Sequence, residues 1–182
     1  MKINKKSGLI EGIEYIPSPN ADERPEAKDP ELIVVHNISL PPGEFGGDHV
    51  KQLFTNTLNP DEHPYFQEIH SLRVSAHAFI HRDGRISQFV PFNKRAWHAG
   101  VSCYKDKQQC NDFSIGIELE GTDDIPYEAV QYRQLADMIN ALRECYTCIT
   151  GDAITGHCDI APDRKTDPGP AFDWDHLKKL IN

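Results

Sequence analysis

The alternation of apolar and polar residues predicts strands and helices in a mixed order. Short runs of apolar and β-branched residues are typical of strands, and they lie at residues 9–16, 31–37, 73–81, 85–90, 113–121 and 153–156. Apolar residues three and four positions apart predict helices, at residues 48–58, 126–144 and 173–181. We expect one domain, residues 1–182, of the α/β (α+β) class, with helices packed against a central mixed β-sheet.

The predicted strand at residues 113–121 has two chemically different faces. Apolar side chains share one face, and the other carries Ser114, Gly116, Glu118 and Glu120. Two carboxylates on a buried face are costly, so Glu118 and Glu120 should face solvent, a basic partner or a functional site. Gly116 leaves room beside Glu118 for a ligand or another backbone segment.

The segment at residues 156–170 carries the densest group of reactive side chains. His157 and Asp167 are both candidate metal ligands, and Lys165 lies two residues before Asp167, on the same side of an extended segment. His36, at the C-terminal end of the predicted strand 31–37, is a third candidate ligand. Zinc accepts imidazole and carboxylate ligands together, and a hydrolytic zinc site has three protein ligands and one open position. These residues predict such a site.

A hydrolytic zinc site also needs groups that move a proton and stabilise charge. Zinc lowers the pKa of bound water from about 15.7 to about 7, which is worth about 12 kcal/mol in forming hydroxide. Glu118 or Glu120 can accept the proton and return it to a leaving amine. Lys165 can stabilise the tetrahedral oxyanion. The sequence therefore predicts a metal-assisted amide hydrolase.

Charge and cysteine content narrow the possible partners. The net charge of −9 argues against nucleic acid as a binding partner. The absence of a visible secretory signal and of a membrane-length apolar run predicts a cytoplasmic protein without a membrane partner. The odd number of cysteines, 5, fits reduced thiols better than a disulfide framework. Cys145 and Cys148 form a lone CxxC motif, for which we expect two small thiols rather than a zinc or redox site.

Several longer motifs resemble those of a known enzyme family. They are VVHNISLPPGEFGG at residues 34–47, RVSAH at 73–77, KRAWHAGVS at 94–102, CNDFSIGIELEGT at 110–122 and TGHCDIAPDRKTDPGP at 155–170. Together they resemble the zinc-dependent N-acetylmuramoyl-L-alanine amidases, which include phage lysozyme-type amidases and peptidoglycan recognition proteins. The resemblance runs from about residue 9 to residue 181.

The resemblance implies a fold like that of these proteins and a role for each candidate. One Zn²⁺ ion would be held by His36, His157 and Asp167. Glu118, rather than Glu120, would activate the water, and Lys165 would stabilise the transition state. The implied reaction cleaves the amide between the lactyl group of anhydro-N-acetylmuramic acid and L-alanine during peptidoglycan recycling. Its substrate is a small molecule, an anhydromuropeptide, and we expect a monomer.

Further residues are candidates for substrate binding. The substrate carries carboxylates, so we expect basic groups near the cleft, with Arg73, Arg95 and Arg164 as candidates. Asn37, Trp97 and His98 are candidates for contact with the sugar or the stem peptide. The long segment at residues 41–71 is a candidate for a loop that gates the cleft.

Other functions remain compatible with the residues. One is a non-catalytic muropeptide-binding module on the same fold, which the complete ligand set and Glu118 argue against. Another is an amidase that acts on intact peptidoglycan, which would need export.

Overall fold

A six-stranded mixed sheet forms the centre of the molecule. The computed structural model describes residues 1–181. The strand order is β12 (Ile154–Gly156), β5 (Leu32–Ile38), β11 (Ser114–Glu120), β6 (Ala78–Ile80), β7 (Ile86–Gln88) and β3 (Glu14–Tyr15). The first four strands are parallel, β7 is antiparallel to β6, and β3 is parallel to β7. The predicted mixed sheet is confirmed.

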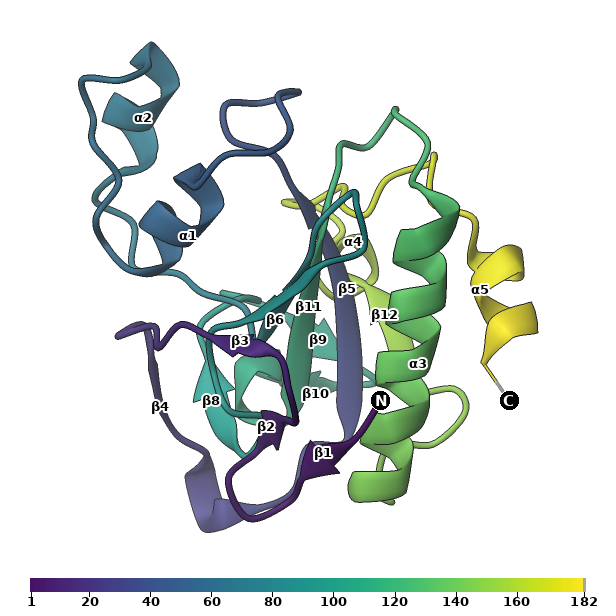
Figure 1. Cartoon of the computed structure of the whole chain (residues 1–182). Coiled ribbons are helices and arrows are strands. Elements are labelled where there is room, and N and C mark those ends of the chain that lie inside the picture. Colours follow the sequence, from purple (N-terminus) through teal and green to yellow (C-terminus); the bar gives the residue numbers. More distant parts are fainter. Residues whose placement is uncertain (182) are drawn as a thin grey trace.

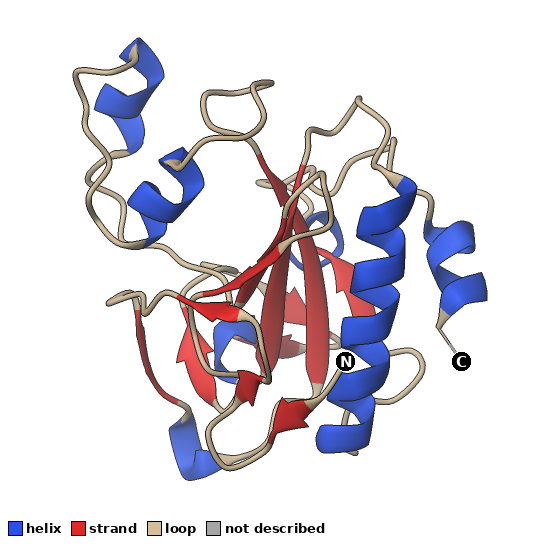
Figure 2. Ribbon diagram, in the orientation of Figure 1, coloured by secondary structure: helices blue, strands red, loops and turns tan. Residues whose placement is uncertain are grey.

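Helices lie on both sides of this sheet. On one side α3 (Ala129–Cys145) packs against the strands and α5 (Trp174–Leu180) lies outside α3, whereas α1 (His49–Phe54) and α2 (Pro64–Ile69) lie on the other side (Figure 1). The short α4 (His157–Ile160) directly follows β12. Figure 2 shows the red strands between these two groups of helices. Within residues 1–181, no helix is both long and apolar enough to cross a membrane.

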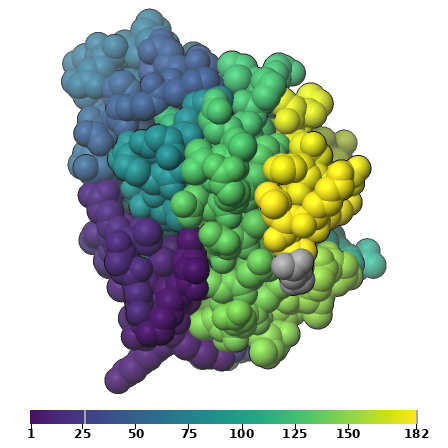
Figure 3. Space-filling model, turned by 45° about the vertical axis from the view of Figure 1, so that its right-hand side comes forward, coloured from purple at the N-terminus to yellow at the C-terminus, as the bar shows by residue number. Residues whose placement is uncertain are grey.

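Short elements complete the fold around the central sheet. Two single-turn 3₁₀ helices, η1 (Pro25–Ala27) and η2 (Cys110–Asp112), accompany three short antiparallel pairs. These pairs join β1 (Ile3–Asn4) to β2 (Leu9–Ile10), β4 (Ala21–Glu23) to β8 (Lys94–Ala96), and β9 (Cys103–Tyr104) to β10 (Lys107–Gln108). Figure 3 shows the C-terminal segment, in yellow, on the surface beside α3.

The main core lies between α3 and the sheet. The apolar stripe of α3 is buried as its spacing predicts, with Leu135, Met138, Ile139 and Leu142 all inaccessible to solvent. It packs with the apolar face of β11, made by Ile115, Ile117 and Leu119. Because side chains alternate along a strand, Glu118 and Glu120 lie on the opposite face of β11.

Helix α3 begins later than its sequence predicts. The predicted helix starts at Pro126, but the structure starts it at Ala129 because Glu128 and Gln131 form a capping box. The Gln131 side-chain oxygen accepts from Glu128 N at 3.0 Å. Its nitrogen donates to the carbonyls of Ile80 and Glu120, at 3.2 and 3.0 Å. The same side chain thus caps the helix and joins it to the sheet.

The other predicted elements are mostly present but shorter. β6 covers only the end of the predicted strand 73–81, and α1 covers the first part of the predicted helix 48–58. The segment at residues 41–71, expected as a loop around one predicted helix, contains a second helix, α2. His63 caps α2, since its Nδ1 accepts from Tyr65 N at 3.1 Å, and Pro64 occupies the first turn.

Candidate metal centre and active site

The parallel strands bring distant residues to one place on the sheet. The register of β5 and β11 pairs His36 with Glu118, so both side chains lie on the face opposite α3. On the other side of β5, β12 pairs Gly156 with Val35, and the next residue is His157. His36 lies two residues before the end of β5, slightly earlier than predicted. The site therefore forms toward the carboxyl ends of neighbouring parallel strands.

Three candidate ligand atoms converge at this point. His36 Nδ1 lies 3.0 Å from His157 Nδ1 and 3.0 Å from Asp167 Oδ2, and His157 Nδ1 lies 3.1 Å from the same oxygen. Ligands about 2.0–2.1 Å from a tetrahedral zinc ion are about 3.3 Å apart. The two imidazole nitrogens and the carboxylate oxygen thus form a nearly regular triangle. A triangle of this size fits three of the four ligand positions of one zinc ion.

The loop that carries Asp167 is fixed by main-chain contacts. Cys158 N donates to Asp167 O at 2.9 Å, which joins the loop to α4. The next carbonyl, of Pro168, accepts from Tyr127 Oη at 2.7 Å and from Asn37 Nδ2 at 3.1 Å. His157 is the first residue of α4. These contacts hold Asp167 beside that residue.

Electrostatics favours the protonation states that bind a metal. Burial lowers the pKa of His36 to about 4, against a smaller opposing effect of Asp167. Burial alone would raise the pKa of Asp167, but the imidazoles of His157 and His36, at hydrogen-bonding distance from its Oδ2, outweigh burial and lower the pKa below its usual range. A neutral imidazole and an ionised carboxylate are the forms that ligate metals.

The structure separates the two glutamates of β11. Glu118 is buried, and its Oε2 has no hydrogen-bond partner within the described part of the chain. Burial raises its pKa well above the usual value, the charge of Asp167 adds to this, and Lys165 opposes it. Glu120 is different, because its two oxygens accept from the main-chain N–H groups of Gly46 and Arg82. Glu118 is available for chemistry, whereas Glu120 anchors two loops.

The ligand cluster opens into a cleft with a volume of about 620 Å³. Lys165, Glu118 and Trp97 line it beside the ligands. Its apolar part is lined from α1, α2 and the segment that follows them, by Leu53, Phe54, Tyr65, Ile69, Leu72 and Val74. The sequence did not indicate this part of the lining.

The arginines expected near the substrate lie in three different settings. Arg73 is exposed, donates to the carbonyls of Ser71 and Leu72, and is absent from the cleft lining. Arg95 is likewise outside the cleft and forms ion pairs at 2.6 Å with both Asp22 and Asp112. Arg164 lines the cleft, but its Nη2 donates to two main-chain carbonyls, as described below. Neither Arg73 nor Arg95 therefore lines the cleft itself, although Leu72 and Val74, on either side of Arg73, do.

The three other substrate-binding candidates all line the cleft, and two of them also make contacts that the sequence did not suggest. Asn37 Nδ2 donates to Asp123 Oδ1 at 2.8 Å, besides its contact with Pro168. His98 Nδ1 lies 2.9 Å from His36 Nε2, and its Nε2 lies 3.1 Å from Ser114 Oγ. Asn37 and His98 thus make hydrogen bonds within the protein itself. Trp97 is the third candidate in the lining.

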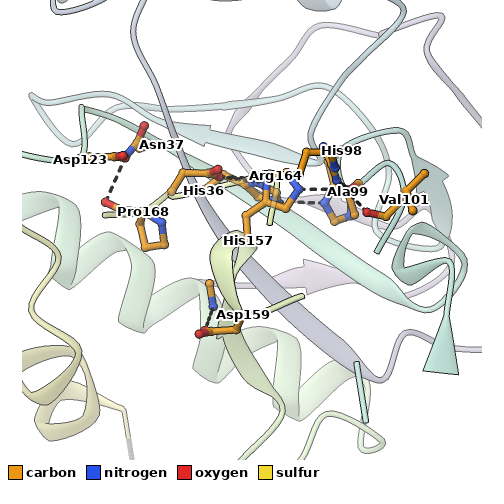
Figure 4. A network of polar contacts seen from close by, with 12 residues as sticks. His36, Asn37, His98, Ala99, Val101, Asp123, His157, Asp159, Arg164 and Pro168 are labelled. Atoms are coloured by element: carbon orange, nitrogen blue, oxygen red, sulfur yellow. Dashed lines mark hydrogen bonds and ion pairs between the residues drawn. The ribbon is translucent and has the colours of Figure 1, made fainter. Parts of the chain in front are cut away.

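The carbonyl oxygen of Ala99 is a further part of the site that the sequence did not reveal. It accepts from His157 Nε2 at 3.2 Å and from Arg164 Nη2 at 2.6 Å, and the same nitrogen reaches the carbonyl of Val101 at 2.8 Å (Figure 4). A main-chain acceptor leaves no trace in the residue pattern. This carbonyl connects one candidate ligand to the loop at residues 97–101.

The fold and the site together define a class of enzyme. The family described as N-acetylmuramoyl-L-alanine amidase matches residues 26–170, and the chain belongs to this family. It is 59% identical over 177 residues to the 1,6-anhydro-N-acetylmuramyl-L-alanine amidase AmpD of Escherichia coli, which covers 97% of this chain and 96% of that protein.

Solved structures agree with this assignment. The crystal structure of a selenomethionine derivative of AmpD superposes with a TM-score of 0.96 at 56% identity and covers 100% of both chains. The amidase AmiD from E. coli, solved with the substrate anhydro-N-acetylmuramic acid-L-Ala-D-γ-Glu-L-Lys, is 30% identical with a TM-score of 0.62. That match covers 85% of this chain and 59% of AmiD.

Proposed function

We propose that the chain is a zinc-dependent hydrolase that cleaves the amide between the lactyl group of anhydro-N-acetylmuramic acid and L-alanine in muropeptides. One observation carries the proposal: at the wall of one cleft, His36, His157 and Asp167 converge, and Glu118 lies with them, its Oε2 without a hydrogen-bond partner among residues 1–181. The names of the AmpD relatives and the ligand of the AmiD complex support the substrate class.

The residues present fit a zinc ion. His36 and His157 would hold it through Nδ1 and Asp167 through Oδ2, because these atoms face one another while both Nε2 atoms are hydrogen-bonded elsewhere. When bound, zinc would act as a Lewis acid that lowers the pKa of water to about 7 and polarises the scissile carbonyl.

Glu118 is the proposed proton carrier. Its carboxylate accepts a proton from the attacking water and returns it to the amine of L-alanine as the amide bond breaks. Its raised pKa suits both steps, because a carboxyl group with a pKa nearer to neutral exchanges protons readily in both directions. Glu118 lines the cleft, and within the described residues its buried Oε2 has no hydrogen-bond partner that would hold the carboxylate in place.

Lys165 is the proposed stabiliser of the tetrahedral oxyanion. It lines the cleft together with Glu118 and Asp167, and no hydrogen bond or ion pair restrains its ammonium group within residues 1–181. A partly buried positive charge of this kind acts where negative charge develops in the transition state. Trp97 and the apolar side chains of α1 and α2 offer a surface for the sugar.

A reducing compartment fits the cysteines. Cys103, Cys110, Cys145, Cys148 and Cys158 are all free thiols. Free thiols are typical of the cytoplasm, where we place the reaction.

Mass spectrometry of the reaction products tests the proposed function. The purified protein is incubated with an anhydromuropeptide and, separately, with whole sacculi. We expect a peptide that begins with L-alanine to be released from the first substrate and not from the second. Release from sacculi alone would favour an amidase of intact peptidoglycan, and binding without release would favour a non-catalytic module. Either result would overturn the proposal.

A further inference from the structure

We propose that His98 and the main-chain carbonyl of Ala99 fix the ring tautomers of His36 and His157, the two histidines that would hold zinc. His98 is then a positioning residue rather than a substrate-binding residue. This inference rests on the zinc amidase function proposed above. A histidine ligates a metal through a nitrogen without a proton, and the hydrogen bond of its other nitrogen decides which nitrogen that is.

The tautomer of His36 follows from three consecutive hydrogen bonds. Ser114 Oγ lies 2.6 Å from the carbonyl oxygen of Cys110, which can only accept, so the hydroxyl donates there. Ser114 Oγ then accepts from His98 Nε2 at 3.1 Å. A neutral His98 with its proton on Nε2 offers Nδ1 as an acceptor to His36 Nε2, at 2.9 Å. His36 is left with a free lone pair on Nδ1, the atom that faces Asp167.

The tautomer of His157 follows from a single contact. Its Nε2 lies 3.2 Å from the carbonyl oxygen of Ala99. A carbonyl cannot donate, so the ring proton is on Nε2 and the lone pair is on Nδ1. Adjacent residues of one loop therefore set both histidines, one through a side chain and the other through the main chain.

This loop is held in place by two further side chains. Asn111 Oδ1 accepts from the main-chain N–H groups of both His98 and Ala99, at 3.1 and 2.8 Å. From the other side, Arg164 Nη2 donates to the carbonyls of Ala99 and Val101. The amide oxygen fixes the peptide groups, and the guanidinium fixes the carbonyl that His157 uses.

Gly116 provides the space for the His98 ring. A Cβ atom at this position would lie 2.4 Å from His98 Cγ and 2.5 Å from its Nδ1, far closer than any real contact. The sequence suggested that this glycine makes room for a ligand or for backbone. The structure shows the His98 imidazole in that place, between β11 and His36.

The carboxylate of Asp167 explains why such partners are needed. Its Oδ2 lies 3.0 Å from His36 Nδ1 and 3.1 Å from His157 Nδ1. A carboxylate only accepts hydrogen bonds, so on its own it favours a proton on Nδ1, where zinc would bind. Acceptors at both Nε2 atoms oppose that arrangement. A histidine that keeps its proton on Nε2 needs no tautomer exchange before it binds a metal.

Zinc affinity of His98 variants tests the proposal. Competition with a chromophoric chelator measures the zinc dissociation constant of folded protein, checked by circular dichroism. We expect His98→Leu to weaken zinc binding about 10- to 100-fold. His98→Asn should retain most of the affinity, because its amide oxygen can replace Nδ1 as the acceptor. Wild-type affinity in His98→Leu, or equal losses in both variants, would overturn the proposal.

A second buried histidine–serine pair gives a matched control. His81 Nε2 lies 3.1 Å from Ser87 Oγ, the distance found between His98 and Ser114, and neither residue contacts a candidate ligand. His81→Leu should leave zinc affinity unchanged. A loss equal to that of His98→Leu would show that removal of any buried imidazole weakens the site, and it would contradict a specific role of His98.

Nitrogen-15 NMR of wild-type zinc-loaded protein gives an answer that does not depend on variant folding. We expect His98 to carry its proton on Nε2 and to have an unprotonated Nδ1. A protein that binds zinc and cleaves its substrate, but has the His98 proton on Nδ1, would overturn this inference alone. A wild-type protein that neither binds zinc nor cleaves would instead overturn the proposed function.

Discussion

At the scale of single residues, the two glutamates on one face of β11 have different roles because their hydrogen-bond partners differ. Glu118 and Glu120 are two residues apart and both are buried, but of the two only Glu120 accepts hydrogen bonds from main-chain N–H groups. A buried carboxylate whose two oxygens both accept hydrogen bonds is held in one geometry. One that lacks a partner keeps a raised pKa and remains free to exchange a proton.

Substitution of Glu118 should separate catalysis from metal binding. We expect Glu118→Gln to retain stoichiometric zinc, measured by elemental analysis, and to lose about 10²- to 10⁴-fold in kcat, the usual contribution of a general base. Glu120→Gln is the matched control, and it should lower stability because it disturbs the anchors of Gly46 and Arg82. If Glu118→Gln kept a kcat near that of the wild type, Glu118 would not be the proton carrier.

The same variant should be more stable than the wild type at higher pH. Burial raises the folded-state pKa of Glu118, so the folded state binds the proton more tightly than the unfolded state does. Its contribution to stability is fully present below the unfolded pKa of about 4.3 and is lost as pH rises through the folded value. Without zinc, Glu118→Gln should not lose this stability. The difference in free energy of unfolding between the variant and the wild type should therefore grow in favour of the variant as pH rises.

Urea unfolding of zinc-free wild type and Glu118→Gln across pH 4 to 9 measures this difference. The two free energies of unfolding should be nearly equal at the acidic end and should separate above it. An advantage of the variant that is constant with pH would mean that the carboxylate does not titrate differently in the folded and unfolded states.

Part of the site could be predicted from single residues, because the chemistry of a side chain limits which metals it can bind. His36, His157 and Asp167 are residue types that bind zinc, and the structure brings their ligand atoms within 4.8 Å of one another. The positions of His98 and Arg164 near the site could be predicted too, but their contacts could not. Their partners are the Ser114 hydroxyl and main-chain carbonyls, which only the tertiary structure brings into range.

At the scale of elements, strong periodicity made some parts of the fold predictable. β11 and α3 carry long, regular apolar patterns, and both are present close to their predicted bounds. α2 has only six residues, and its three apolar positions, Tyr65, Phe66 and Ile69, are too few to predict a helix from periodicity. The strands of two residues are formed by pairing with a partner strand, which a local pattern does not record.

The close packing of β11 against the loop that carries His98 gives a prediction for Gly116. Gly116→Ala should displace the His98 ring, because a new Cβ would lie 2.4 Å from it. We expect a loss of stability of about 1–3 kcal/mol from overpacking, together with weaker zinc binding. Gly151→Ala is the control, since the nearest atom to its Cβ is Arg143 Nη2 at 4.0 Å.

Thermal unfolding and chelator competition on the two alanine variants check this prediction. Gly151→Ala should resemble the wild type in both measurements. If Gly116→Ala also matched the wild type in zinc affinity, the imidazole of His98 would not need its present position to support the ligands.

At the scale of the whole molecule, the proposed zinc site joins segments that are far apart in the sequence. His36 comes from β5, His157 from the start of α4, and Asp167 from the loop that follows α4. An ion bound by all three would connect the centre of the sheet to the C-terminal part of the chain. Because the unfolded chain does not hold these ligands together, zinc should bind only the folded protein and stabilise it.

Removal of zinc should therefore lower the melting temperature of the whole protein. At a free zinc concentration 100 times the dissociation constant, binding to the folded state alone contributes about 2.7 kcal/mol. For a chain of this size that corresponds to about 5–10 °C, since 1 kcal/mol shifts the melting temperature by about 2–4 °C. Differential scanning calorimetry with zinc and with a chelator measures the shift. Asp167→Asn should lose most of it, whereas a double replacement of Cys145 and Cys148 by serine should retain it. The opposite pattern would place the ion at the CxxC motif and would contradict the proposed ligands.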